Sequence, residues 1–171
     1  TLSLHDALPI FPSASTNVSV IAPYDFDNDG DLDLVVNNVN DKAFIYQNKA
    51  NEAKDNQYIS IQLNGSEKNR NAIGSKVILF TNNQIRTYEK FPVKGFLSSM
   101  EVPMLIGLKQ TKLDSAFLVW PDNSFEKIDL TKQFNKQISY TYKKGLPVFN
   151  YDIIKKHWPT AEYSMQDLTA S

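Results

Sequence analysis

An acidic loop that runs directly into an apolar segment constrains the fold of this chain more than any other feature. Residues 25–33 read DFDNDGDLD, so five carboxylates fall within nine residues. Leu34, Val35 and Val36 follow at once, and such a run is typical of a buried strand. The carboxylates repel one another unless a cation lies among them. The sequence therefore predicts a strand–loop–strand unit built around a metal ion.

Calcium is the metal that suits this loop best. Ca²⁺ takes about six to eight oxygen ligands in flexible geometry, whereas Mg²⁺ prefers strict octahedral geometry with few protein ligands. Gly30 allows the chain to reverse around the ion. We expect the ligands to be the side chains of Asp25, Asp27 and Asp29, the backbone carbonyl of Asp31, and Asp33 directly or through water.

The loop begins like an EF-hand but does not end like one. Position 12 of an EF-hand is a bidentate Glu, and Val36 stands there in this chain. Neither histidine lies near the loop in sequence, because His5 precedes it by twenty residues and His157 lies far beyond it. We therefore expect a structural calcium site rather than a catalytic one; a solvated acidic turn is the alternative.

Short apolar segments separated by turn residues make up most of the chain, and they predict an all-β fold. In residues 58–63, Ile59, Ile61 and Leu63 share one face of a strand. Asn-rich turns separate other segments, since Asn tolerates positive φ. The expected strands are 17–22, 32–36, 43–46, 58–63, 76–80, 84–90, 116–120, 124–130 and 137–142, with one or two helical turns within 151–157. We predict a calcium hairpin segment, a small antiparallel β-sandwich or barrel, and an irregular C-terminal tail.

Composition excludes several classes of protein. Hydrophobic residues make up 42% of the 171 residues, which is enough for a packed core. The net charge is −1 and no basic stripe is present, so we expect no nucleic-acid partner. The chain has no cysteine, which excludes disulfides and thiolate sites. No apolar run approaches the roughly 20 residues of a membrane span.

Two stretches of the chain are expected to lie outside the folded domains. Residues 1–10 (TLSLHDALPI) have no basic leader, so they fail as a signal peptide, and we expect them to be a non-native leader. Residues 48–56 (NKANEAKDN) are polar and without a long apolar face, and we interpret them as a linker.

The acidic segment DFDNDGDLDLVVNN resembles a VCBS/FG-GAP repeat, which forms one blade of a β-propeller. The resemblance implies that Asp25, Asp27, Asp29 and Asp33 are side-chain ligands of calcium and that Asp31 contributes its carbonyl. Only one such loop is present, and a single blade cannot bury its faces alone. We therefore expect a propeller-blade-like segment whose neighbouring blades are missing from this chain.

Residues 58–130 resemble an ASPIC/UnbV domain, as found in cartilage acidic protein-like and bacterial surface proteins. Two departures from the family pattern are Ile106 and Lys109 around Gly107-Leu108, and Asn123 where Gly is usual. The matching segments are NRNAIGSKV at 69–77, GFLSS at 95–99, IGL at 106–108 and VWPDN at 119–123. The implied organisation is a leader at 1–10, a repeat at 11–50, a β domain at 57–143 and a tail or linker at 144–171.

From these features we expect a non-catalytic, calcium-stabilised interaction or adhesion module, extracellular or at the cell surface. Its partner would be an unknown protein or glycan. Ser98 and Ser99 have no evident histidine partner, so we expect no enzyme. The alternative is a carbohydrate-binding module that uses exposed aromatic side chains. Its candidates are Tyr88, Phe96 and Trp120, although Trp120 suits a packed turn residue better.

Overall fold

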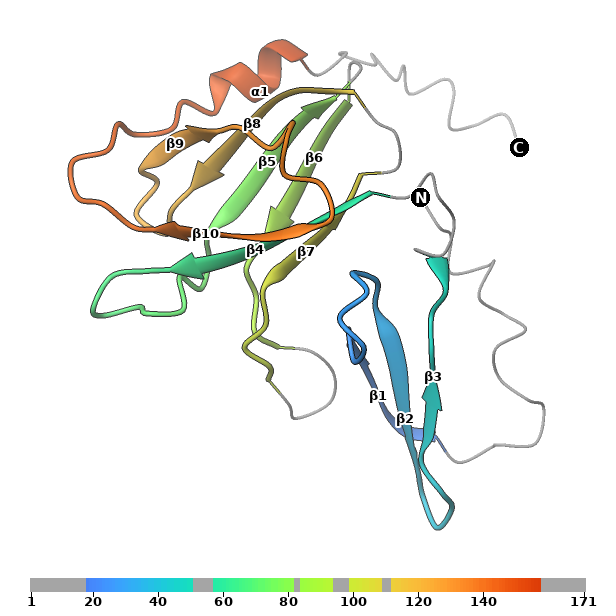
Figure 1. Cartoon of the computed structure of the whole chain (residues 1–171). Coiled ribbons are helices and arrows are strands. Elements are labelled where there is room, and N and C mark those ends of the chain that lie inside the picture. Colours follow the sequence, from blue (N-terminus) through green and yellow to red (C-terminus); the bar gives the residue numbers. More distant parts are fainter. Residues whose placement is uncertain (1–17, 51–56, 82–83, 94–98, 109–111, 158–171) are drawn as a thin grey trace, which may run out of the picture. The chain divides into compact units, whose positions relative to one another are not determined.

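The computed structural model describes residues 18–50, 57–81, 84–93, 99–108 and 112–157, and it is all-β as predicted. Ten strands form three sheets in these residues, and none of the sheets closes into a barrel (Figure 1). The chain divides into two compact units. The first holds the described parts of 1–63, 91–110 and 134–140, and the second holds those of 64–90, 111–133 and 141–171. The predicted leader at 1–10 lies outside the described residues.

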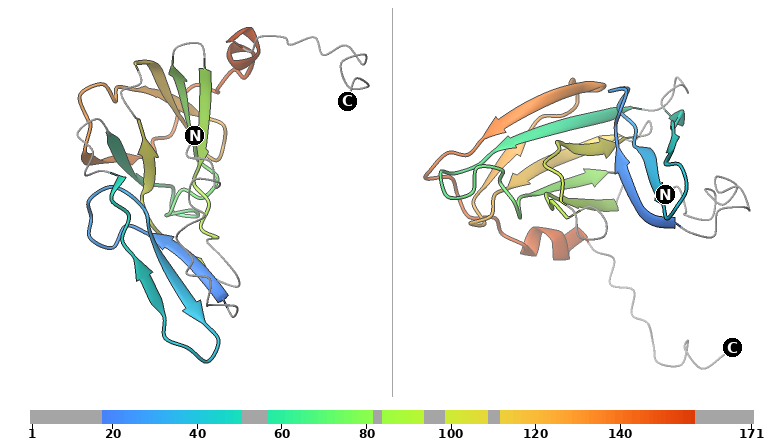
Figure 2. Two further views of the ribbon diagram at one scale, coloured as in Figure 1. Left: turned by 90° about the vertical axis from the view of Figure 1, so that its right-hand side faces the viewer. Right: turned by 90° about the horizontal axis from the view of Figure 1, so that it is seen from below.

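The first sheet is a three-stranded antiparallel meander, and the acidic loop connects its first two strands. It has the order β1 (Val18–Tyr24), β2 (Asp33–Asn38) and β3 (Phe44–Tyr46), and Figure 2 shows the three strands side by side. Tyr24 pairs with Asp33 at the end of β1 and the beginning of β2. The acidic loop is therefore the hairpin connection of two paired strands, and the predicted strand–loop–strand unit is confirmed.

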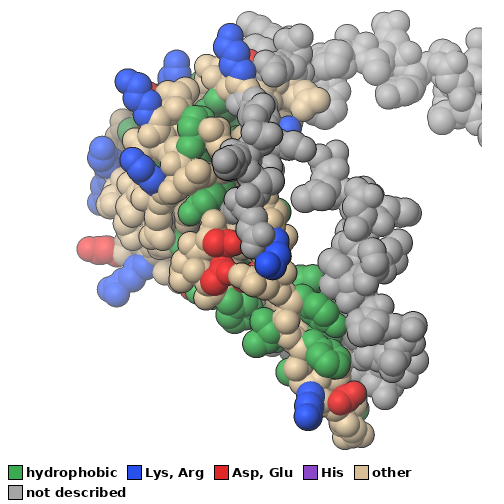
Figure 3. Space-filling model, turned by 45° about the vertical axis from the view of Figure 1, so that its right-hand side comes forward, with side chains coloured by type: hydrophobic (Ala, Val, Ile, Leu, Met, Phe, Trp, Pro, Cys, Tyr) green, Lys and Arg blue, Asp and Glu red, His purple; other side chains and the backbone are tan. Residues whose placement is uncertain are grey.

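Both faces of this sheet carry apolar side chains. Because paired residues of antiparallel strands point to the same side, Ile21, Val36 and Phe44 share one face. The adjoining row belongs to the other face, and it includes Val35 and Ile45. Val36 is buried, whereas Ile45 is 70% exposed. Hydrophobic side chains consequently gather along the surface of this sheet (Figure 3).

The second sheet has the order β10 (Lys136–Thr141), β4 (Tyr58–Asn64) and β7 (Met104–Gly107). The predicted inward face of β4 is confirmed, because Ile59, Ile61 and Leu63 are buried. β7 runs antiparallel to β4. β10 runs parallel to β4, since backbone hydrogen bonds join Asn135 to Tyr58 at one end and Tyr142 to Asn64 at the other. The sheet is therefore mixed, a feature that the predicted antiparallel arrangement did not include.

The third sheet is antiparallel and contains the most deeply buried strand of the second unit. Its order is β6 (Gln84–Glu89), β5 (Lys76–Thr81), β8 (Leu113–Val119) and β9 (Phe125–Ile128). β5 lies between two neighbours, and Val77, Ile78 and Leu79 are buried in succession. An uninterrupted apolar run is the pattern of a strand covered on both faces.

Part of the predicted tail packs on this third sheet. The backbone N–H of Phe125 donates to Pro147 O, and that of Phe149 donates to Asn123 O. Phe149 is buried in a cluster that also contains Ile78, Phe80 and Val119, with Ile153 and Ile154 packed against it. The predicted helical turns are confirmed as α1 (Asp152–His157). The domain boundary placed at residue 144 stays a prediction.

Candidate metal centre

Three carboxylates of the acidic loop converge. Oxygen atoms of Asp25, Asp27 and Asp29 all lie within 4.8 Å of one another, and no other group of three potential ligands meets this condition in the described part of the chain. The three residues alternate in sequence, so the loop must turn tightly for their side chains to meet on one side. The structure thus brings together the first three of the predicted ligands.

Two residues in the left-handed region produce this turn. Asn28 has φ of 59° and Gly30 has φ of 91°. Asn tolerates this conformation and Gly adopts it without steric cost. Gly30 is also closed in by β4, because a Cβ atom at this position would overlap the ring of Tyr58. The second constraint comes from a residue twenty-eight positions away, and the loop sequence by itself did not predict it.

Backbone and side-chain hydrogen bonds hold the three carboxylates in place. Asp25 accepts from the N–H groups of Asp29 at 3.1 Å and Gly30 at 3.2 Å, one on each oxygen. Asp29 Oδ1 accepts from the N–H of Asp31 at 3.0 Å, and Asp27 Oδ2 accepts from Gln47 Nε2 at 2.6 Å. A carboxylate oxygen has two lone pairs, so each of these oxygens keeps capacity for a cation.

The electrostatics of Asp25 also fit a cation. Burial raises the pKa of this carboxyl group most, and the neighbouring charge of Asp29 raises it further, against the lowering effect of the Gly30 N–H. A divalent cation between the carboxylates would replace this repulsion with attraction. The donors are carboxylate oxygens, which are the hard ligands that calcium takes in proteins.

Asp33 and Asp31 take different places from the converging three. Asp33 begins β2 and is 2% exposed; its Oδ2 accepts from the N–H of Phe26 at 2.9 Å, and its Oδ1 accepts from the N–H of Asn48 at 2.8 Å. These two hydrogen bonds connect the start of the acidic loop and the segment after β3 to the first residue of β2. Asp31 is buried. The predicted ligand roles of these two residues stay predictions.

Trp120, one of the three aromatic candidates for sugar stacking, is buried and packed. Trp120 is 1% exposed, its Nε1 donates to Glu126 Oε1 at 3.2 Å, and Tyr142 packs edge-to-face on it. The prediction of a packed turn residue is confirmed. Tyr88 is half-buried, and Phe96 lies outside the described residues, as does Ser98.

Two of the predicted Asn-containing turns lie in the described part of the second unit, and both are turns in the structure. Asn69 Oδ1 accepts from the N–H of Ile73, and Asn69 Nδ2 donates to Ile73 O, so the side-chain amide of Asn69 closes the turn. Asn123 adopts φ of 63° after Trp120-Pro121-Asp122. Both turns lie in segments that resemble an ASPIC/UnbV domain, NRNAIGSKV at 69–77 and VWPDN at 119–123.

Residues 65–145 match the family described as ASPIC and UnbV. The ASPIC/UnbV match contains β5 to β10 and both Asn-rich turns, and it begins after the acidic loop and β1 to β3. The predicted resemblance to ASPIC/UnbV is confirmed over these residues. No curated protein matches the chain. In the part of the chain that the structure describes, no helix has the length and apolar character that a membrane crossing requires.

Proposed function

We propose that this chain is a non-catalytic, calcium-stabilised interaction module of an extracellular or cell-surface protein. The observation that carries the proposal is the convergence of Asp25, Asp27 and Asp29 in a hairpin loop between two paired strands. The resemblance of this loop to a VCBS/FG-GAP repeat supports the same role. The ASPIC/UnbV match, which follows the loop in sequence, fits the domain combination of cartilage acidic protein-like and bacterial surface proteins.

Calcium would stabilise this module by binding the folded loop and not the unfolded chain. In the folded loop the three carboxylates meet, with Asn28 and Gly30 in left-handed conformations. Free calcium at about 100 times the dissociation constant would add about 2.7 kcal/mol to the free energy of unfolding. Extracellular modules bind calcium with dissociation constants of about 10⁻⁴ to 10⁻³ M, so an extracellular location would keep such a loop occupied.

Exposed apolar side chains on the first sheet support a place within a larger propeller. Ile45 and Ile21 lie on opposite faces of β1 to β3, and both are exposed. In a repeat fold such as a propeller, each unit buries its apolar side chains against the neighbouring units. We propose that this sheet packs against further blades and that the whole assembly recognises a protein or glycan partner.

The burial of Trp120 weighs against the carbohydrate-binding alternative. Stacking on a sugar needs an exposed aromatic face, and Trp120 has almost no exposed surface. Glycan-array binding that disappeared on replacement of Tyr88 would restore this alternative.

Hydrogen exchange of the full chain with and without calcium tests the proposal. The N–H groups of Asp29 and Gly30 donate to Asp25, so calcium should slow their exchange. Asp27→Asn should remove this effect of calcium. Asp41→Asn, in the exposed turn between β2 and β3, removes a charge of the same kind and should preserve the effect. Exchange rates that do not respond to calcium in the unaltered chain would contradict the proposal.

A further inference from the structure

The loop after β4 begins with a chemically labile pair of residues, Asn64-Gly65, which is the only Asn-Gly pair in the chain. An asparagine before glycine loses ammonia more readily than one before a bulkier residue, because glycine has no side chain to hinder attack by its own backbone nitrogen. Asn64 is exposed and Gly65 is half-buried. The covalent stability of this pair therefore depends on the conformation of the loop around it.

The fold requires glycine at position 65. A Cβ atom at this position would overlap the carbonyl oxygen of Asn69, and it would also crowd the backbone of Ala72. Ala72 is fully buried, so its backbone has little room to move away. Packing of the loop has thus selected the residue that makes Asn64 labile.

Hydrogen bonds hold both halves of the pair in the folded chain. The N–H of Gly65 donates to Arg70 O at 2.8 Å, and Asn64 O accepts from the N–H of Tyr142 at 2.8 Å. Asn64 Nδ2 donates to Thr141 Oγ1 at 3.4 Å. Loss of ammonia requires Gly65 N to give up its proton and to bond to the side-chain carbonyl carbon of Asn64. The hydrogen bond from Gly65 to Arg70 must therefore break before the reaction starts.

The rest of the loop supports this arrangement. The N–H of Asn69 donates to Ser66 O at 3.0 Å, and the N–H of Ala72 donates to Asn69 O at 3.0 Å. The side-chain amide of Asn69 makes two further hydrogen bonds to the backbone of Ile73. Gly65 consequently begins a loop that is closed by its own hydrogen bonds.

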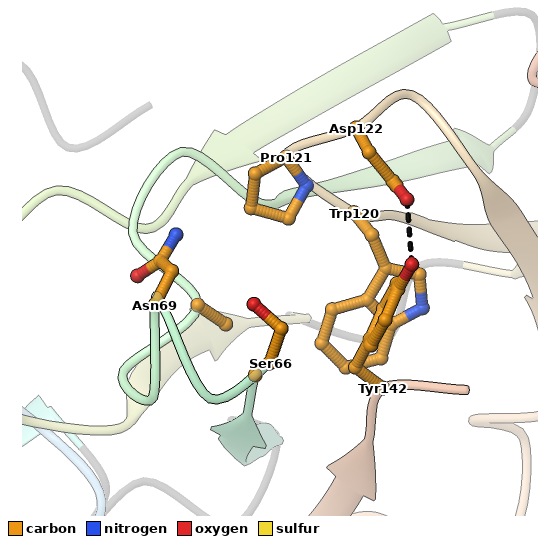
Figure 4. A pocket seen from close by; sticks show the side chains of 8 residues that line it. Ser66, Asn69, Trp120, Pro121, Asp122 and Tyr142 are labelled. Atoms are coloured by element: carbon orange, nitrogen blue, oxygen red, sulfur yellow. Dashed lines mark hydrogen bonds between the residues drawn. The ribbon is translucent and has the colours of Figure 1, made fainter. Parts of the chain in front are cut away.

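Water has access to the pair even in the folded chain. Gly65 lines a hollow of about 180 Å³, and Figure 4 shows Ser66 and Asn69 on one side of it and Trp120 and Tyr142 on the other. A hollow of this size holds water molecules. Conformation, and not exclusion of water, is therefore what protects Asn64.

We propose that Asn64 is a deamidation site that the folded loop keeps unreactive and that reacts when the loop opens. Gly65 N loses its proton to hydroxide and attacks Asn64 Cγ. The bond from Cγ to Nδ2 breaks, ammonia leaves with a proton from water, and a five-membered succinimide forms. One water molecule then opens the ring at either carbonyl and gives aspartate or isoaspartate, so the net reaction consumes one water and releases one ammonia.

The product would prevent the loop from closing again. Isoaspartate adds a methylene group to the main chain before Gly65, and it places a negative charge at the end of β4. The hydrogen bond from Gly65 to Arg70 then loses its register, so each opening that reacts is recorded irreversibly. This proposal goes beyond the interaction role, and a failure of calcium binding would leave it intact.

Peptide mapping by mass spectrometry of the full chain, incubated in mildly alkaline buffer, tests the proposal. A synthetic peptide of residues 61–68 with blocked ends, in the same buffer, supplies the rate without the fold. The peptide should convert to aspartate and isoaspartate, and the folded chain should react at least about ten times more slowly. Equal rates in the two, or no conversion of the peptide, would overturn the proposal.

Two variants connect the rate to opening of this loop. Asn69→Ala removes both side-chain hydrogen bonds to Ile73, and it should speed deamidation of Asn64 about three to ten times. Asn150→Ala is its matched control, because Asn150 accepts from the N–H of Asp152 in another turn of the same unit. It should leave the rate unchanged. Equal effects of the two variants would contradict the proposal.

Sub-denaturing urea provides a second measurement that needs no substitution. The deamidation rate of Asn64 and the hydrogen-exchange rate of the Gly65 amide should rise in parallel, since both require the Gly65 N–H to leave Arg70 O. A deamidation rate that stays constant while exchange of this amide becomes faster would also overturn the proposal.

Discussion

Gly30 lies so close to the ring of Tyr58 that any Cβ atom at position 30 would overlap it. The contact joins the acidic loop to β4 within the first unit. Gly30 is thereby fixed by two independent requirements, a positive φ and a close approach. The loop geometry that brings the carboxylates together depends on both.

We predict that Gly30→Ala destabilises the protein by about 2–4 kcal/mol, from left-handed strain plus the overlap with Tyr58. Gly74→Ala is a matched control, because Gly74 has φ of 89° but no atom within 4 Å of an added Cβ. It should cost only about 1–2 kcal/mol. Urea unfolding monitored for each unit by hydrogen exchange measures both changes. Equal losses would show that the contact with Tyr58 has no energetic effect.

Asp33 should contribute to stability even without calcium. Asp33→Ala would leave the N–H groups of Phe26 and Asn48 without their acceptor, at a cost of about 2–4 kcal/mol. Asp33→Asn keeps one oxygen acceptor and should cost less. Hydrogen exchange of the Phe26 and Asn48 amides in metal-free protein measures the effect. Unchanged protection of both amides in Asp33→Ala would contradict this role.

The pair of Asp122 and Tyr142 should respond to pH at both extremes. The pKa of Asp122 lies below its ordinary value of 3.8, chiefly through the Ser124 and Tyr142 hydroxyls, so its stabilising effect is complete above pH 3.8 and is lost as the pH falls through the folded-state pKa. The pKa of Tyr142 is raised above 10.0 chiefly by its hydrogen bond to Asp122. The contribution of this hydrogen bond to stability is therefore complete below pH 10.0, and it is lost as the pH rises through the raised pKa.

NMR titration of the Asp122 carboxyl carbon, in the unaltered chain and in Tyr142→Phe, measures this coupling. Removal of the phenol should raise the pKa of Asp122 toward 3.8 while Ser124 keeps part of the shift. A pKa of Asp122 that is the same in both proteins would contradict the coupling.

Trp120 should act as a core residue. Trp120→Ala is predicted to cost about 3–5 kcal/mol, as expected for loss of a large buried aromatic side chain. Trp120→Phe should cost less, because it keeps an aromatic ring against Tyr142 but loses the hydrogen bond to Glu126. Guanidinium chloride unfolding measures both; a loss below about 1 kcal/mol for Trp120→Ala would be inconsistent with its burial.

Local patterns predicted much of this fold, and distant pairings explain what they missed. The alternation of Ile59, Ile61 and Leu63 identified β4 because one strand face is buried along its own length. β7 (Met104–Gly107) escaped prediction; it is defined by its pairing with β4, in which Ile106 lies opposite Ile59, forty-seven residues earlier. The parallel course of β10 beside β4 depends on contacts nearly eighty residues apart, which no local pattern encodes.

At the candidate site too, local spacing predicted part of the arrangement, and contacts between distant residues determined the rest. The spacing of Asp25, Asp27 and Asp29 predicted their convergence, because the ligands of one loop are local. The overlap at Tyr58 and the hydrogen bond from Asn48 to Asp33 required the three-dimensional structure. Burial of Phe149 was likewise absent from the prediction, which treated its segment as a tail.

Isothermal titration of calcium into the metal-free full chain tests the central claim most directly. The account predicts saturable binding of a single ion, a melting temperature that rises with free calcium, and loss of both effects in Asp27→Ala. An absence of binding heat together with a melting temperature that ignores calcium would contradict it.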